Sequence, residues 1–223
     1  MAGGFRPTDR DGLAAHLVER VTAVPGRLRV VVDGSPPTGP VELARAVAGL
    51  LRDRGRDALA VDADDFLRPA SVRLEFGRTD PAMFLDGWLD EPALRREVLG
   101  PMAPDGSGSV LPRLRDVHRD RAFRDEPVPL GASGVVLLGG GRLLGRGLPA
   151  DLTVTCGWDG PPWSAGCRRI SPGPRPPTPG TRRRAIPART RTCSRWPTIR
   201  SVPLYVTARR RTVTDMRAPH RNG

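Results

Sequence analysis

One segment limits the fold more than any other: an apolar run that leads through a glycine-framed turn into a helix. Residues 28–32 are Leu-Arg-Val-Val-Val and predict a buried strand that ends at Asp33. The helix expected over 40–54 then carries its apolar residues three and four positions apart. Because a largely apolar strand is typical of a parallel sheet covered on both faces, this order predicts the first unit of an α/β fold.

Strands and helices continue to alternate along residues 1–155. Such alternation favours a three-layer α/β fold built on a parallel sheet. Ligands of these sheets bind where the strands end, so the acidic residues after the first two strands are candidate site residues. The further elements that we expect are a helix over 8–24, strands over 58–61, 135–138 and 152–155, and a helix over 91–98.

The turn between the first strand and its helix has the spacing of a phosphate-binding loop. Such a loop has Gly, four residues, Gly, and then Lys and Ser or Thr. Here Pro40 and Val41 follow the second glycine, and the chain contains no lysine. Pro40 brings neither a charge nor a backbone N–H. Two interpretations stay open: a tight turn with proline at the first helical position, or an altered phosphate loop whose nucleotide-binding candidates are Gly34, Ser35, Thr38 and Gly39.

The segments that follow resemble one family in their order and spacing. Residues 61–69, Val-Asp-Ala-Asp-Asp-Phe-Leu-Arg-Pro, resemble the Asp-x-Phe segment of the uridine kinase-like P-loop kinases. Residues 80–101 are similar to the Pro-led short helix, the Asp and the second helix of the bacterial members. Residues 111–127 resemble the extended arm, and residues 134–144 the central strand and its turn. The resemblance covers about residues 28–155 and implies a three-layer parallel sheet of P-loop kinase type.

The resemblance also implies a reaction: phosphorylation of a nucleoside 5′-hydroxyl, with ATP and Mg²⁺ as cofactors. Asp64 matches the catalytic base of the family, which accepts the hydroxyl proton. Asp62 and Asp65 are candidate Mg²⁺ ligands because this cation prefers carboxylate oxygens. Phe84 is the candidate for stacking on the base of the nucleoside substrate. The alternatives are a solvated acidic turn for the three aspartates and a core position for Phe84.

Three departures from the family favour a non-catalytic relative, which binds nucleotide or a partner, as the alternative function. The phosphate loop lacks its Lys and its Ser or Thr. The strand over 135–138 is followed by three glycines, where the family has an acidic residue near the metal. The arginine-bearing lid helix of the family has no recognisable counterpart downstream.

The composition changes abruptly after Thr155. Residues 1–155 hold 21 arginines and 22 acids, whereas residues 156–223 hold 15 arginines, 2 acids and only seven Ile, Leu or Val. So few aliphatic residues cannot offset an ordering cost of about 1–2 kcal/mol per residue, so we predict a disordered basic tail rich in proline and arginine. We hypothesise that it is a shifted-frame product of a GC-rich gene.

A second interpretation of the tail is binding of nucleic acid, as a sequence-independent partner. The arginine runs at 182–184 and 209–211, with Trp196 and Tyr205 between them, supply groups that contact phosphates and stack on bases. The rest of the chain argues for a cytoplasmic protein without membrane contact. It has no apolar run of about 18 residues and no secretory signal, and its three cysteines form no closed disulfide framework.

Overall fold

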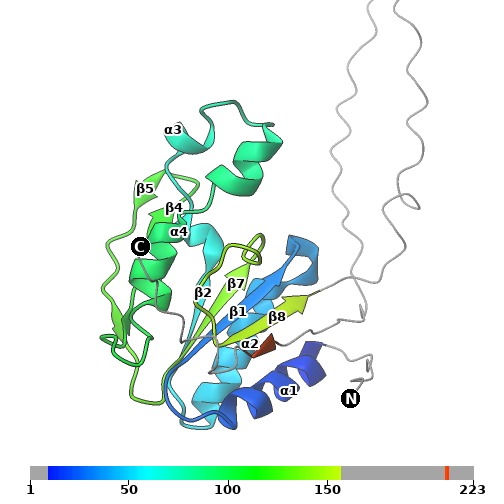
Figure 1. Ribbon diagram of the computed structural model, residues 1–223, viewed down its shortest axis with the longest axis vertical. Coiled ribbons are helices and arrows are strands. Elements are labelled where there is room, and N and C mark those ends of the chain that lie inside the picture. The colour runs from blue at the N-terminus through cyan, green and yellow to red at the C-terminus, as the bar shows by residue number, and fades with distance from the viewer. Residues whose placement is uncertain (1–9, 157–208, 211–223) are drawn as a thin grey trace, which may run out of the picture. The chain divides into compact units, whose positions relative to one another are not determined.

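Four parallel strands form the centre of the structure, in the order β2-β7-β1-β8 (Figure 1). The computed structural model describes residues 10–156 and 209–210. The strands are β1 (Leu28–Gly34), β2 (Ala58–Asp62), β7 (Val135–Gly140) and β8 (Leu152–Cys156). The predicted parallel sheet is therefore confirmed, with each predicted strand at its expected place in the chain.

The register of the sheet brings the predicted strand ends to one edge. β1 is paired on both sides, with β7 from Leu28↔Val135 to Asp33↔Gly140 and with β8. β2 pairs with the other side of β7 and ends with Asp62 opposite Gly139. Asp33 and Asp62 therefore lie at the same edge of the sheet, on either side of the last residues of β7.

Two amphipathic helices cover one face of the sheet (Figure 1). These are α1 (Arg10–Thr22), shorter than the helix expected over 8–24, and α2 (Pro40–Asp53), which agrees with the prediction. α2 begins directly after Gly39 and is followed by Gly55, which has a φ of +75°. A positive φ is easily adopted by glycine, so Gly55 suits the end of a helix. The core of this face contains the following buried side chains: Leu13, Leu17, Val18, Val21, Val30, Val32, Leu43, Val47, Leu51, Val135, Leu137, Leu152 and Val154.

The opposite face is covered by the segment expected to be helical over 91–98. It consists of one turn of α-helix, α4 (Glu91–Ala93), continued by the π-helical η4 (Leu94–Leu99). The connection from β7 to β8 also packs here, although it contains no helix. The core of this face contains Val31, Val61, Phe66, Leu67, Leu89, Leu94, Val98, Leu99, Met102, Val136, Leu138, Leu143 and Leu148.

The remaining short elements lie in the connections between these strands and helices. The arm expected over 111–127 includes a small antiparallel pair, β4 with β5, and the segment around it pairs β3 with β6. Their bounds are η1 (Pro36–Thr38), η2 (Ala63–Phe66), α3 (Ala70–Arg73), η3 (Met83–Gly87), β3 (Ser109–Val110), β4 (Arg115–Asp116), β5 (Arg121–Ala122) and β6 (Val128–Pro129).

One short strand comes from the predicted basic tail. β9 (Arg209–Arg210) pairs antiparallel with β8, with Leu152 opposite Arg210. β8 itself runs to Cys156, one residue beyond the expected end of the α/β unit. The other tail residues, and with them the shifted-frame and nucleic-acid hypotheses, lie outside the described residues. Within residues 10–156 and 209–210, no helix has the length and apolar character needed to cross a membrane.

Candidate functional site

The predicted phosphate loop is closed by its own hydrogen bonds. It forms the 3₁₀ turn η1, in which the Thr38 amide and hydroxyl both donate to the Ser35 carbonyl, at 2.8 Å and 2.7 Å. The Gly39 amide donates to the Pro36 carbonyl at 3.1 Å. Residues 36, 37 and 40 are prolines and have no amide hydrogen. No residue from 36 to 40 therefore presents a free backbone N–H, the group with which such loops hold phosphate.

The two glycines that frame this loop are nonetheless required by the backbone. Gly39 has a φ of +66°, which favours glycine. A Cβ on Gly34 would lie 2.8 Å from the Cβ of Cys156, closer than side chains pack. The guanidinium of Arg10, at the start of α1, lies beside Gly39 and the carboxylate of Glu42. Its charge stands near the turn, but residues 36–40 offer no free amide with which to hold the phosphates of ATP.

The glycines at the end of β7 leave no space for side chains. A Cβ on Gly139 would lie 2.9 Å from the Cα of Val41 and 3.0 Å from the Pro40 carbonyl oxygen. A Cβ on Gly140 would meet the side chain of Ala63. α2 and η2 therefore pack directly on the backbone of β7. An aspartate at Gly139 or Gly140 would have no room in this structure.

The acidic cluster at the end of β2 contains three carboxylates in different surroundings. Asp62 caps η2 by accepting a hydrogen bond from the Asp64 amide at 3.0 Å, and it pairs with Arg45 at 3.3 Å. Burial raises the pKa of Asp62. Burial, and then the charge of Asp62, raises the pKa of Asp65 to about 6. Asp64 has a side chain 67 % exposed and is the carboxylate best placed to meet a ligand from solution.

The acidic cluster offers few free carboxylate oxygens to a Mg²⁺ ion. Within residues 10–156 and 209–210, no group of three or more His, Cys, Asp or Glu side chains is arranged to hold a metal ion. Both oxygens of Asp62 already accept from Asp64 or Arg45. A magnesium ion here would need water or a bound phosphate for most of its shell, as is common for this cation. The assignment of Asp62 and Asp65 as ligands stays a prediction.

Arg142 joins two residues that the sequence singled out for separate reasons. Its Nη2 lies 3.6 Å from Oδ1 of Asp64, and its Nη1 donates to the Phe84 carbonyl at 2.7 Å. Its guanidinium carbon stands 4.3 Å from the centre of the Phe84 ring. Phe84 is 45 % exposed, so the alternative of a core position is wrong. Asp64, the predicted catalytic base, and Phe84, the predicted stacking residue, thus form one cluster around Arg142.

Trp88 extends this cluster on its other side. Its ring meets Phe84 edge to face, with centroids 5.1 Å apart. The guanidinium of Arg73, itself almost fully buried, lies 5.1 Å from the Trp88 ring, and that of Arg142 lies 5.9 Å from it. Within the part of the chain that the structure describes, the buried indole N–H of Trp88 has no hydrogen-bond partner. Leaving such a donor unpaired costs about 1–3 kcal/mol of folding free energy, so the N–H of Trp88 destabilises this arrangement of the cluster.

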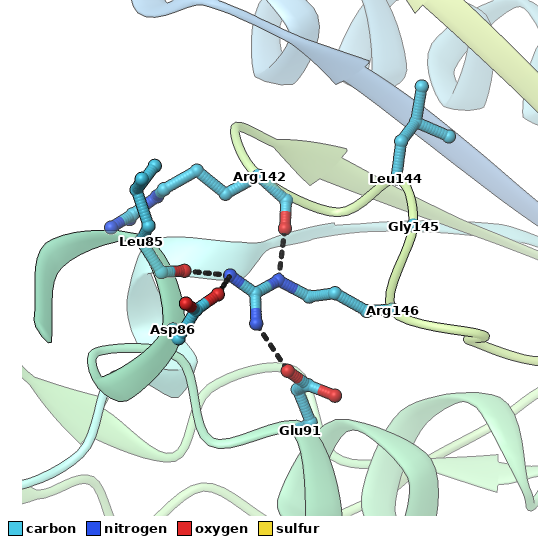
Figure 2. A pocket seen from close by; sticks show the side chains of 7 residues that line it. All are labelled: Leu85, Asp86, Glu91, Arg142, Leu144, Gly145 and Arg146. Carbon is cyan, nitrogen blue, oxygen red and sulfur yellow. Dashed lines mark hydrogen bonds and ion pairs between the residues drawn. The ribbon is translucent and has the colours of Figure 1, made fainter. Parts of the chain in front are cut away.

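Beside this cluster, a cavity of about 440 Å³ opens between the loop after β7 and the segment 85–91 (Figure 2). Arg146 lies at its centre and donates to the backbone oxygens of Leu85 and Arg142 and to the Glu91 carboxylate. Its Nη2 is also 3.9 Å from Asp86, a carboxylate 86 % exposed. Leu85 and Leu144 form part of the wall, and both are exposed. The cavity thus combines two leucines with the charged side chains of Asp86, Glu91, Arg142 and Arg146.

The loop that carries these arginines is held by the strand ends. The Leu143 amide donates to Oδ1 of Asp33 at 2.6 Å, which fixes the loop to the end of β1. Arg95 donates to the carbonyls of Arg146 and Gly147, at 2.7 Å and 3.1 Å. Arg142 itself has a φ of +64°, uncommon for a residue with a side chain. A strained backbone of this kind often occurs at a binding site.

Arg142, Arg146 and Trp88 were not among the predicted site residues. A signal for the arginines exists: the run Gly-Arg-Leu-Leu-Gly-Arg-Gly directly follows a buried strand, at the edge where ligands bind. The structure brings together Asp64 and Phe84. It places the loop residues Gly34, Ser35, Thr38 and Gly39 at the neighbouring strand end, beyond the glycines of β7.

Comparison with known proteins supports the fold. No protein-family profile matches the chain, and no curated protein is similar enough in sequence to count as a match. A solved structure described as a possible uridine kinase from Bacillus stearothermophilus matches with a TM-score of 0.55 at 18% identity, over 64% of this chain and 78% of that one. A chain described as a fructose transport system kinase, from a Silicibacter species, matches with a TM-score of 0.46 at 23% identity, over 60% of this chain and 64% of that one. The first, together with the strand order and the helices on both faces, shows that the chain has the fold of the P-loop kinases.

Proposed function

We propose that this protein binds a nucleoside at the carboxyl edge of its sheet, as a relative of uridine kinase-like enzymes that has lost efficient use of ATP. One observation carries the proposal: Arg142 contacts both Asp64 and Phe84. A carboxylate that accepts from a hydroxyl and an exposed aromatic ring that stacks on a base are the groups a nucleoside needs.

The phosphate loop supports the loss of ATP use. Binding of phosphate by such loops depends on free amides and a lysine, and residues 36–40 offer neither. Removing a single preorganised donor of this kind typically slows a reaction by about 10²–10³. We therefore expect nucleoside binding to be retained and affinity for ATP to be weak.

A second candidate function is slow ATP-dependent phosphorylation of the nucleoside 5′-hydroxyl. It is favoured by Asp64, because its exposed carboxylate can accept the proton of a hydroxyl and, like Phe84, contacts Arg142. The same protein could carry out this reaction at a low rate if another cation replaced the missing lysine. Arg10 beside Gly39 is the candidate for that replacement.

The experiment that tests both is titration calorimetry with a nucleoside panel, followed by transfer of labelled phosphate from ATP. The proposal expects saturable binding of at least one nucleoside, lost in Phe84→Ala, with no transfer above that of Asp64→Ala. Transfer that depends on Asp64 would favour the second candidate. Absence of nucleoside binding would overturn the proposal.

A repaired loop provides a gain-of-function control. The double variant Pro40→Lys and Val41→Thr restores the residues that a phosphate loop has after its second glycine. If the acceptor side is intact, the repaired protein should transfer phosphate faster than the original chain, by about 10²-fold or more. Asp64→Ala in the repaired protein should abolish the gain. A repaired protein that binds ATP but transfers nothing would argue against an intact acceptor side.

A further inference from the structure

We propose that Arg142 is a displaceable guard over Phe84, which must leave the ring before a nucleobase can stack there. This inference rests on the proposed nucleoside function and adds to it a conformational step and the residue that performs it. The guanidinium occupies the space above the ring, 4.3 Å from its centre, where a stacked base would lie. A base and the guanidinium therefore compete for the same face of Phe84.

The guard is held by contacts that can be exchanged. Arg142 is attached at both ends of its guanidinium, to the Phe84 carbonyl at 2.7 Å and to Asp64 at 3.6 Å. The carboxylate of Asp64 is mostly exposed, so water screens this ion pair and replaces it readily. The cation–π contact with the Phe84 ring adds to this attachment. Together these contacts favour the closed position without fixing it.

The closed position includes one strained backbone conformation. The backbone of Arg142 has a φ of +64°, which costs energy for any residue with a Cβ. A base that replaced the guanidinium over Phe84 would free Asp64 from Arg142. Binding of the base would therefore release the carboxylate that meets the sugar.

Peptide-resolved chemical modification tests the guard directly. Phenylglyoxal modifies exposed guanidinium groups, and mass spectrometry of the digested protein gives a rate for each arginine. We expect saturating uridine to raise the rate at Arg142 several-fold. Arg113 is a matched control within the same protein, because its guanidinium also stacks on a ring, 4.1 Å from Phe123, and pairs with Asp125 at 2.7 Å. Its rate should not change.

Substitution of the guard gives a second readout. If only the open fraction of the protein binds uridine, the apparent affinity is the intrinsic affinity multiplied by that fraction. Arg142→Ala removes the guard and should therefore bind uridine about tenfold more tightly. Arg142→Gly should do the same and suits the positive φ, which protects the test against misfolding of the alanine variant. Arg113→Ala should leave the affinity unchanged.

The outcomes distinguish failure of the guard from failure of the proposed nucleoside function. Uridine that binds and slows modification of Arg142, or leaves it unchanged, overturns the guard while the nucleoside function stands. Weaker binding by Arg142→Ala and Arg142→Gly also overturns it, since Arg142 would then hold the ligand. Binding by these variants but not by the original chain overturns the displaceable guard, since the guanidinium would then never leave the ring, and the proposed function of the original chain fails with it. If no variant binds uridine or any other nucleoside, the proposed function fails, and the guard fails with it.

Discussion

Arg146 forms an ion pair with Glu91 across the cavity, which joins the connection after β7 to the first turn of α4 (Figure 2). The connection has no helix of its own, so hydrogen bonds from arginine side chains replace those that a helix would have made within its backbone. The Arg146 side chain is 12 % exposed, and it also binds the Leu85 carbonyl. It is therefore the main attachment of this loop to the opposite wall.

Replacing this arginine should destabilise the protein measurably. Arg146→Ala leaves the Glu91 carboxylate and the Leu85 carbonyl without their donor, and such losses at a partly buried site cost about 2 kcal/mol. The free energy of unfolding in urea measures the effect. Arg96→Ala is the matched control, because its pair with Glu97 is exposed and should contribute less than about 0.5 kcal/mol. Equal losses in the two variants would contradict this role for Arg146.

Gly139, at the end of β7, should tolerate no side chain. A Cβ there would lie 2.9 Å from the Cα of Val41, and neither backbone can move away without shifting α2. We expect Gly139→Ala to lower the free energy of unfolding by about 2 kcal/mol, as overpacking of a core does.

The control for that change is a glycine with open space around it. Gly49 lies inside α2, and among the described residues no atom other than those of its chain neighbours and of the helix's own backbone lies within 4 Å of the position of a Cβ. Gly49→Ala should therefore stabilise the protein by about 0.5–1 kcal/mol, through helix propensity alone. Urea unfolding of both variants checks the pair, and a harmless Gly139→Ala would show that the end of β7 is more adaptable than its packing indicates.

The scaffold could be predicted from the sequence because its signals are local. The apolar runs of β1, β2 and β7 and the three-and-four spacing of α2 each identify an element without reference to the rest of the chain. Asp33 and Asp62 could be placed at one edge because parallel strands end together.

The site could be predicted only in part, since its key contacts are tertiary. Asp64 and Phe84 were found through the order of segments, but Arg142 reaches the Phe84 carbonyl from 58 residues away. Neither the residue type of Arg142 nor its neighbours in the sequence predict its positive φ. The closure of the phosphate loop by Thr38 is local, yet spacing alone could not distinguish a closed turn from an open one.

The start of β8 depends on a carboxylate that the sequence analysis did not single out. Asp151 accepts from the Arg29 amide at 2.9 Å and forms a two-point pair with the Arg29 guanidinium, at 3.0 Å and 2.7 Å. We expect Asp151→Ala to cost about 2 kcal/mol, because the Arg29 side chain is only 11 % exposed and would lose its partner. Urea unfolding measures the loss, and amide exchange at Arg29 should become faster. Asp151→Asn, which can still accept from the amide, should lose less; an alanine variant as stable as the original would refute the role of this pair.

The stability of the protein should depend on pH through Asp65. Burial and the neighbouring charge of Asp62 raise the pKa of Asp65 to about 6 in the folded state, above its ordinary value of 3.8. The folded state therefore binds a proton more tightly than the unfolded state. The unfavourable contribution of Asp65 is absent below about pH 4, grows as the pH rises through the interval from 4 to 6, and is complete above it.

Removing this carboxylate should therefore stabilise the protein at neutral pH but not in acid. Since Asp65 is partly exposed, we expect Asp65→Asn to raise the free energy of unfolding by about 1 kcal/mol at pH 7, with the difference vanishing towards pH 4. Urea midpoints between pH 4 and 8, in buffer with a chelator, measure it, and Asp105→Asn controls for the loss of one surface carboxylate. A difference that stays constant with pH would contradict the assignment. Mg²⁺ in place of the chelator provides a further test: if Asp65 is a ligand, the cation should offset the repulsion and reduce the advantage of Asp65→Asn at pH 7.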